Sequence, residues 1–243
     1  MGEDLHNIEL VLRDRRIREA ILTTLLTATV STGLLLLFGV PLAYGVSRLR
    51  FPGRGLLLAL IDIPIVIPQS VAGVALLLVL GRQQVIGGAL AEWFGVRFDG
   101  TVLGICAAQV FVAMPFLVKA AIAAFDGVDE ELEFAARTLG ATSWRSFRRV
   151  ALPLAGRGIF LGAVLAWARA AGEFGALVFV APTPATAPVA VWDRFQAVGL
   201  RETGPVVALL LLFSIVLFAL LQWMSRFLPS VYGAREAGAA WRA

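Results

Sequence analysis

Two small groups of polar residues interrupt the apolar segments of this 243-residue chain. Arg169 and Glu173 lie four residues apart inside one apolar segment, and Pro68, Gln69 and Ser70 follow one another inside a different one. Ionisable residues at membrane depth are costly and usually face a protein interior or water. An arginine that shapes the local potential, a glutamate that controls it, and neutral donors that bind weakly are together suited to the passage of an anion.

Each group also has a purely structural explanation. Arg169 and Glu173 share one face of a helix, so the two charges could neutralise each other and pin the helix to its neighbours. Pro64 and Pro68 each remove a backbone hydrogen bond, and the kink that they predict could serve packing alone. Asp62, in the same segment, would repel an anion, so we expect it to pair or to reach toward water. The residues by themselves leave both explanations open.

The sequence contains none of the residue sets that are typical of enzyme active sites or metal centres. It has one Cys and one His, and it lacks both a glycine-rich phosphate loop and a Gly-x-Ser-x-Gly elbow. We therefore expect no catalytic residue, metal or cofactor in this chain, and any energy from ATP must come from a separate subunit. A net charge of +4 in so apolar a chain indicates membrane orientation and anionic headgroups rather than nucleic acid.

The elements that must position these residues are membrane-spanning α-helices. Hydrophobic residues make up 59% of the chain and charged residues 16%, against about 25% charged residues in a soluble domain. Five apolar segments can each cross roughly 30 Å of hydrocarbon: about 20–46, 56–80, 101–124, 158–181 and 205–228. We predict an all-α polytopic membrane domain over 20–228, with an amphipathic segment at 1–19 before it and a tail at 229–243 after it.

The arginines outside these segments predict how the chain is oriented. The first and third links and the tail hold eleven arginines, whereas the second and fourth links hold four. Because arginine and lysine are enriched on the cytoplasmic side, we expect the N-terminus outside and the C-terminus inside the cytoplasmic membrane. Four arginines that precede the first segment reduce the difference to eleven against eight without reversing it.

The third link, residues 126–156, is too polar to cross a membrane but has a helical pattern. Four small or apolar residues fall on one helix face, at positions Leu132, Ala135, Ala136 and Leu139. Gly140 follows them as a C-terminal cap, and a second helix is predicted from Ser143 as its N-cap to Pro153. Such an element either lies on the membrane or neighbouring spans, or forms a docking site for a cytoplasmic partner.

The stretch "EFAARTLGATSWRSFRRVALP" resembles the coupling-loop signature of the permease subunits of ATP-binding cassette (ABC) importers. The matching positions are Ala135, Ala136, Gly140, Val150, Leu152 and Pro153. The sequence departs from the signature at Phe134, where the family usually has Glu, and Glu133 lies one residue earlier.

Further stretches are similar to the molybdate/tungstate permeases of this superfamily. They are "RFPGR", "IPIVIPQSVAG", "DGVDEELE", "WARAAGEFGA" and "APVAVWDRFQAVGLRETGPVVALLLL", and the resemblance runs from about residue 18 to 228. Sulfate permeases have similar "RFPGR" and "GEFGA" stretches, so sulfate or thiosulfate remains an alternative substrate. A stand-alone secondary transporter is a further alternative, which would move its substrate without an ATPase.

The resemblance implies a type I ABC importer permease fold with a cytoplasmic coupling helix pair. It also implies a homodimer, two ATPase subunits that bind ATP and Mg, and an extracytoplasmic oxyanion-binding protein that delivers the anion. The residues that it implies for contact with the ATPase are Glu131, Leu132, Glu133, Ala135, Ala136, Leu139, Gly140 and Ala141.

Overall fold

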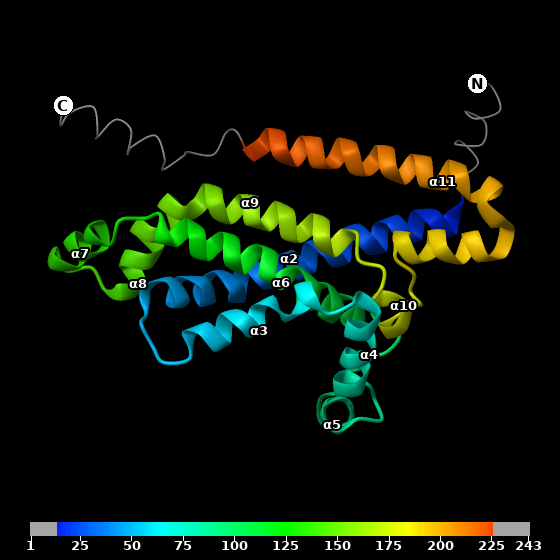
Figure 1. Cartoon of the computed structure of the whole chain (residues 1–243), viewed down its shortest axis with the longest axis horizontal. Coiled ribbons are helices and arrows are strands. Elements are labelled where there is room, and N and C mark those ends of the chain that lie inside the picture. Colours follow the sequence, from blue (N-terminus) through cyan, green and yellow to red (C-terminus); the bar gives the residue numbers. More distant parts are fainter. Residues whose placement is uncertain (1–13, 226–243) are drawn as a thin grey trace.

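Three long helices form the centre of the molecule. The computed structural model describes residues 14–225, and its regular elements over that range are helices (Figure 1). The helices α2 (Arg15–Arg48), α6 (Val102–Asp126) and α9 (Leu152–Ala171) pack against one another along their lengths. By length and composition, α2, α6 and the continuous helix Ser143–Ala171 could each cross a membrane. The all-α prediction is confirmed, and the predicted segments 20–46 and 101–124 lie within α2 and α6.

Small side chains allow these helices to approach closely. The buried face of α6 carries Ala113 and Ala121, and that of α9 carries Ala163, Ala166 and Ala170. At two glycines of α9 the contact is closer still. A Cβ atom on Gly158 would lie 2.6 Å from the Cβ of Ala124, and one on Gly162 would lie 2.6 Å from the Cβ of Ala120. Helices in lipid associate through such close packing, because water does not drive their apolar faces together.

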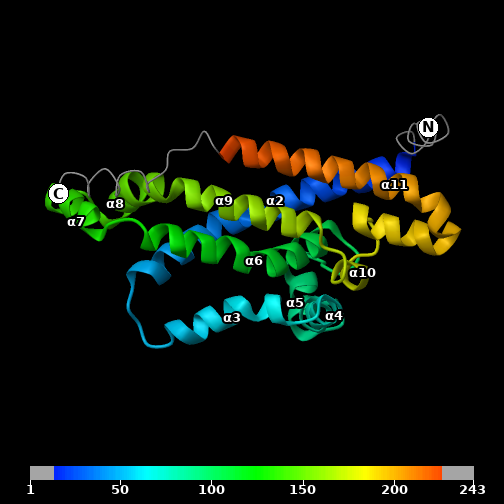
Figure 2. The ribbon, with the colours of Figure 1, turned by 45° about the horizontal axis from the view of Figure 1, so that its top comes forward.

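The second predicted span is broken in the middle. The helices α3 (Arg54–Val66) and α4 (Gln69–Leu80) are separated by a short break at which the chain bends by 117°. Ile67 has the extended backbone that a following proline favours, and Pro68 precedes the first residue of α4. The predicted segment 56–80 is therefore divided between two helices, and the break lies at one of the prolines for which a kink was predicted. Figure 2 shows α3, α4 and α5 (Val85–Phe94) to one side of the central helices.

The fourth predicted span, 158–181, is shifted along the chain. Its helix ends at Ala171, and residues 172–176 form a loop before the short helix α10 (Leu177–Val180). At the other end, α8 (Ser143–Ser146), the π-helical segment η1 (Phe147–Ala151) and α9 form one continuous helix. The helix begins at Ser143, as predicted, but its N-cap is Thr142, whose side chain accepts a hydrogen bond from the N–H of Arg145. The prediction of Ser143 as the N-cap is therefore wrong.

The prediction that the helix ends at Pro153 is also wrong, because the turn before the proline is not α-helical. The N–H of Leu152 donates to the carbonyl of Phe147, five residues earlier, which makes the turn before Pro153 wider than an α-helical turn. A proline in a regular helix clashes with the carbonyl four residues before it, and a wider turn relieves that clash. The helix therefore continues through Pro153.

The last helix, α11 (Ala187–Ser225), reverses direction within its length. Gly199 has φ of 80° and ψ of −176°, and the two halves of α11 meet there (Figure 1). Its second half runs beside α2 and α9, and a mostly apolar cavity of about 690 Å³ lies among the three helices. The predicted span 205–228 falls in this half, and its last three residues, like the predicted tail 229–243, lie outside the described residues. With the broken α3–α4 pair counted as one span, the described part of the chain has up to four candidate spans, so the predicted count of five is not reproduced.

The glycine contacts between α6 and α9 predict that alanine lowers the free energy of unfolding at Gly162 and raises it at Gly156. We expect Gly162→Ala to lower the free energy of unfolding by about 1 kcal/mol, because overpacking outweighs the gain in helix propensity. A Cβ atom on Gly156 of the same helix would have no neighbour within 4 Å, so Gly156→Ala should raise stability by up to about 1 kcal/mol. Denaturant unfolding of the purified variants in detergent measures both effects. Equal stabilities would contradict the close approach of the two helices.

Candidate functional site

The predicted helix of the polar link is present at one end of the molecule. Helix α7 (Glu130–Thr138) begins after Asp129, whose carboxylate accepts a hydrogen bond from the N–H of Glu131. It ends before Gly140, which has φ of 89°, a backbone conformation that glycine adopts readily. Figure 1 shows α7 beyond the ends of the central helices. The helix and its glycine turn are therefore as predicted.

The apolar residues of α7 do not pack against the rest of the chain. Leu132 is 50% exposed, Leu139 is 89% exposed, and Ala135 between them is also exposed. Phe134, which stands where the coupling signature usually has Glu, is 54% exposed, and the guanidinium of Arg137 lies over its ring. We call these four apolar residues (Leu132, Phe134, Ala135 and Leu139) the α7 stripe. Because the stripe is uncovered, packing against neighbouring spans of the same chain does not explain it.

The opposite side of α7 is fastened to α2 by a buried carboxylate. Glu133 is 2% exposed, and it accepts hydrogen bonds from the hydroxyl of Tyr44 and from Nε of Arg48, the latter at 2.8 Å. Arg48 also donates to the carbonyl of Val128, 3.0 Å away, in the turn before α7. Every charged group in this contact therefore has a partner, as a buried ion pair requires.

An aromatic cluster joins the remaining helices at the same place. The ring of Tyr44 lies 5.3 Å from that of Phe125 in α6 and 4.7 Å from that of Phe147 in η1. The hydroxyl of Ser146 donates to the backbone carbonyl of Glu133, which connects α8 to α7. We call this group (Tyr44, Arg48, Phe125, Glu133 and Phe147) the α7 junction. The α7 junction therefore connects α7 to α2, to α6 and to the start of the long helix.

The sequence predicts that Glu133 lies in this region but does not identify its partners. In the sequence, Arg48 counts only among the arginines that predict orientation. The spacing of Tyr44 and Arg48, four residues apart in the last turns of α2, places both on one helix face and is the signal that the sequence offered.

Near the other end of the molecule, the two predicted groups of polar residues come together. The loop 172–176 after α9 packs against the first turns of α4. A Cβ on Gly73 would lie 2.7 Å from the carbonyl oxygen of Ala176, and one on Gly175 would lie 2.6 Å from the Cβ of Gln69. The stretches "IPQSVAG" and "GEFGA" are therefore in backbone contact. Pro68, Gln69 and Ser70 are exposed at the break between α3 and α4.

Glu173 holds this loop in place. Its side chain is fully buried; Oε1 accepts a hydrogen bond from the N–H of Ala176 at 2.8 Å, and Oε2 lies 2.6 Å from Arg169 Nη1. The structure thus shows the mutual neutralisation of Arg169 and Glu173 that the sequence allowed. Arg169 keeps 20% side-chain exposure, so its guanidinium is not fully enclosed.

Several other polar residues join helices in the protein interior. Gln109, fully buried, accepts a hydrogen bond from Ser31 and donates to the carbonyl of Ala170 at the end of α9. Thr24 accepts a hydrogen bond from the N–H of Ala187 at the start of α11. At the exposed surface of the same bundle, Asp62 pairs with Lys119 of α6 at 3.0 Å, so the prediction that Asp62 pairs or reaches toward water is confirmed.

Thr27 does not add to these links between helices, and the acidic residues of the described part do not form a metal site. Thr27 donates to carbonyls of its own helix rather than to a neighbouring one. Over 14–225, no three or more His, Cys, Asp or Glu side chains are grouped so that they could hold a metal ion.

The α7 junction predicts a strong energetic coupling between two residues that are 85 positions apart in the sequence. Glu133→Ala should lower the free energy of unfolding by about 3 kcal/mol, because it leaves the largely buried Arg48 with only Glu130, 4.0 Å away, as a counter-charge. In a double-mutant cycle with Arg48→Ala, we expect a coupling energy of about 1–3 kcal/mol. Arg50→Ala, which removes an exposed arginine from the same link, is the matched control and should cost little. Additive effects of the two alanine substitutions would contradict the junction.

Comparison with known proteins agrees with this architecture. Residues 35–231 match the family model described as a binding-protein-dependent transport system inner membrane component. The chain is 41% identical over 227 residues to the molybdate/tungstate transport system permease protein of Thermococcus kodakarensis, a match that covers 92% of this chain and 85% of the relative. It is 37% identical over 214 residues to the molybdenum transport system permease protein of Escherichia coli, covering 86% and 93%.

A solved structure shares the fold. In the crystal structure of a bacterial alginate ABC transporter in complex with an alginate pentasaccharide-bound periplasmic protein, one chain superimposes with a TM-score of 0.66. The match covers 89% of this chain and 81% of that one at 19% identity. From the family match over most of its length and from relatives at this level of identity, the chain belongs to the family of inner membrane components of binding-protein-dependent transport systems.

Proposed function

We propose that this chain is the membrane-spanning subunit of an ATP-driven importer for molybdate or tungstate. The observation that carries the coupling is an apolar stripe left uncovered on α7, on a helix whose other side is fixed to the spans through Glu133. The substrate class is supported by the functions that the names of relatives at 41% and 37% identity state. Membership of an inner-membrane family supports a multi-pass location there.

The α7 stripe is the surface on which an ATPase subunit docks. We expect no ATP site in this chain, so ATP and Mg bind on that partner. When two ATPase subunits close around ATP, they move the α7 helices of two permease copies. Because the α7 junction is closely packed and its charges are paired, the spans follow as rigid bodies and alternate between inward-open and outward-open arrangements.

The residues of this chain that contact the ATPase are those predicted from the sequence, except that Glu133 has a different role. Leu132, Ala135 and Leu139 are exposed and point into the interface, and Glu131 and Ala141 lie beside them. Glu133 is buried and acts through the junction, which makes it a positioning residue rather than a contact. Phe134 adds apolar area at the place where the coupling signature usually has a charge.

The anion passes near the break between α3 and α4. The N-terminal turn of α4 presents Gln69 and Ser70 and a first turn of backbone N–H groups, which favour a negatively charged group. Arg169 adds positive potential, while Glu173 balances that charge and fixes the loop that supports α4. A nearly neutral site holds the anion weakly, so that it can leave toward the cytoplasm.

The remaining partners follow from the family. The described chain lines only part of a pathway, so a second copy completes it as a homodimer. A binding protein docks from outside, as the periplasmic protein does in the alginate transporter. The end that carries α7 faces the cytoplasm, and the N-terminus lies outside.

A transport assay tests the substrate. The permease is co-purified with an ATPase subunit and an oxyanion-binding protein from the same organism and reconstituted in liposomes, and uptake of molybdate, tungstate and sulfate is measured with ATP inside. We expect molybdate or tungstate to be taken up in preference to sulfate, and no uptake without the ATPase. Preferential sulfate uptake would overturn the substrate, and uptake without the ATPase would overturn the ATP-driven class.

A pair of equally exposed residues tests the docking role of the α7 stripe. Leu139 is 89% exposed in the turn after α7, and Val85 is 90% exposed in α5, far from α7. Leu139→Ser should reduce transport-stimulated ATPase activity roughly tenfold if it contributes as a central interface residue, and it should weaken co-purification of the ATPase. Val85→Ser should change neither measurement. An unchanged Leu139→Ser complex would show that the ATPase docks elsewhere.

A further inference from the structure

A second exposed surface lies beside the α7 stripe, at the start of the long helix. Arg145, Arg148 and Arg149 are exposed, and Trp144 next to them is 65% exposed. None of the three arginines forms an ion pair with a carboxylate of residues 14–225, and the sequence between Glu133 and Glu173 contains no acidic residue. We call these four residues the basic face. Its positive charge therefore has no partner in the part of the chain that the structure describes.

The position of the basic face along its helix is that of a membrane boundary. The continuous helix Ser143–Ala171 has 29 residues. At 1.5 Å per residue this is about 43 Å, whereas the hydrocarbon is roughly 30 Å thick. The helix is therefore longer than the hydrocarbon by about nine residues. Three of its five arginines lie within residues 143–151 at its start, which makes this the most polar part of the helix. Tryptophan is enriched at this depth, where its ring lies among the lipid headgroups.

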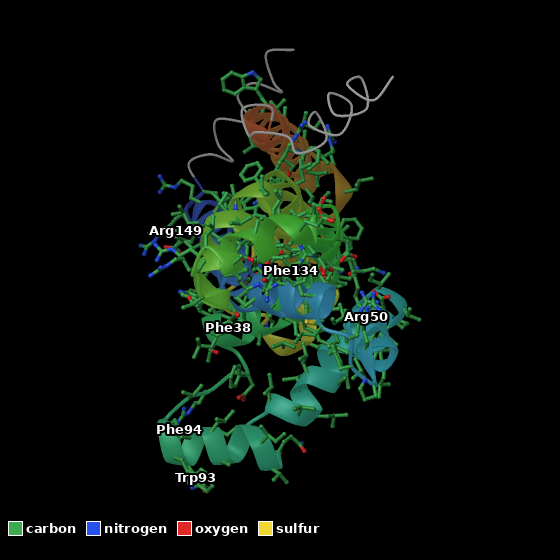
Figure 3. All side chains as sticks on the ribbon, turned by 90° about the vertical axis from the view of Figure 1, so that its left-hand side faces the viewer. Phe38, Arg50, Trp93, Phe94, Phe134 and Arg149 are labelled. Carbon is green, nitrogen blue, oxygen red and sulfur yellow. The ribbon has the colours of Figure 1, made fainter. Side chains whose placement is uncertain are left out.

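The direction of the basic face separates it from the ATPase interface. Ser146, Phe147 and Ala151 are buried against the bundle, so the arginines between them occupy the outward side of the helix. Figure 3 views the molecule from the α7 end: Phe134 lies near the middle of the outline, whereas Arg149 projects from its edge. At this end of the molecule Arg149 therefore projects sideways from the bundle, apart from Phe134.

We propose that the basic face is a binding site for the headgroup of an anionic phospholipid. Guanidinium groups bind phosphate oxygens through paired N–H donors, and the exposed ring of Trp144 lies beside the glycerol and upper acyl region. Each arginine near an anionic membrane strengthens binding by about fivefold. The bound lipid holds the start of the long helix, to which Ser146 ties the backbone of Glu133.

Lipid binding by the purified full-length permease in detergent tests this site. The inference uses the membrane topology of the proposed function but neither its substrate nor its ATPase, so the binding assay succeeds or fails independently of transport. Phosphatidylglycerol or phosphatidylcholine is titrated into the protein, and bound lipid is counted by native mass spectrometry. We expect phosphatidylglycerol to bind more tightly than phosphatidylcholine, and Arg148→Gln/Arg149→Gln to weaken that binding by roughly 10- to 30-fold.

Three controls assign the effect. Arg82→Gln/Arg97→Gln removes the same charge from exposed positions in the opposite link and should bind phosphatidylglycerol like the unmodified chain. Arg148→Lys/Arg149→Lys keeps the charge and should retain most of the binding, which separates loss of charge from misfolding. Glycerol phosphate without acyl chains should compete only at much higher concentration than the lipid.

Two results would overturn the proposal. In one, the Arg148→Gln/Arg149→Gln variant binds phosphatidylglycerol as tightly as the unmodified chain. In the other, it keeps the lipid but no longer co-purifies with the ATPase, which would assign the basic face to the protein interface instead.

Discussion

The attachment of α7 to the central helices depends on the buried carboxylate of Glu133. The apolar residues of α7 are on its exposed side, so they cannot fasten it to the bundle without losing the docking surface. Only the opposite side of the helix remains for attachment, and there Tyr44 and Arg48 bind the carboxylate. A polar attachment is also directional, because a misplaced carboxylate leaves the largely buried Arg48 with only Glu130, 4.0 Å away, as a counter-charge. Such a contact fixes the angle of α7 more firmly than apolar packing of small residues does.

At the other end, two breaks in the backbone support each other. Helix α9 stops at Ala171 and α4 starts after Pro68, and each break frees backbone groups that lipid cannot satisfy. Irregular backbone is tolerated at membrane depth where protein covers it or water reaches it. Here Glu173 accepts the N–H of Ala176, and Gly73 and Gly175 let the loop touch α4 without side chains between them. A hydrophilic position is thereby created between two apolar segments, where an anion passage needs one.

Local sequence signals predicted some elements well and others poorly. The helical pattern of residues 130–139 and the glycine at 140 are signals within one short stretch, and the structure has the helix and the turn that they predict. The shift of the fourth span was not predictable from hydropathy, because residues 174–181 are as apolar as the span itself. What ends the helix is the pair Gly172–Glu173, whose effect depends on a loop hydrogen bond and on Arg169. The partners of Glu133 and Gln109 depend on how distant helices meet, and no window of the sequence contains that information.

The α7 stripe is apolar and the basic face is positively charged, and this difference fits the partner proposed for each surface. A surface that binds a protein in the cytoplasm gains from exposed apolar area, and the α7 stripe has it. A surface at the same depth that faces sideways meets phosphate headgroups, where apolar residues gain little and unpaired arginines keep their hydration or exchange it for phosphate oxygens. The turn between α7 and α8 joins the two surfaces, which both lie within residues 132–149. In the proposed mechanism α7 moves with the ATPase while the bound lipid restrains the start of the long helix, and the two surfaces have opposite chemistries on adjoining helices.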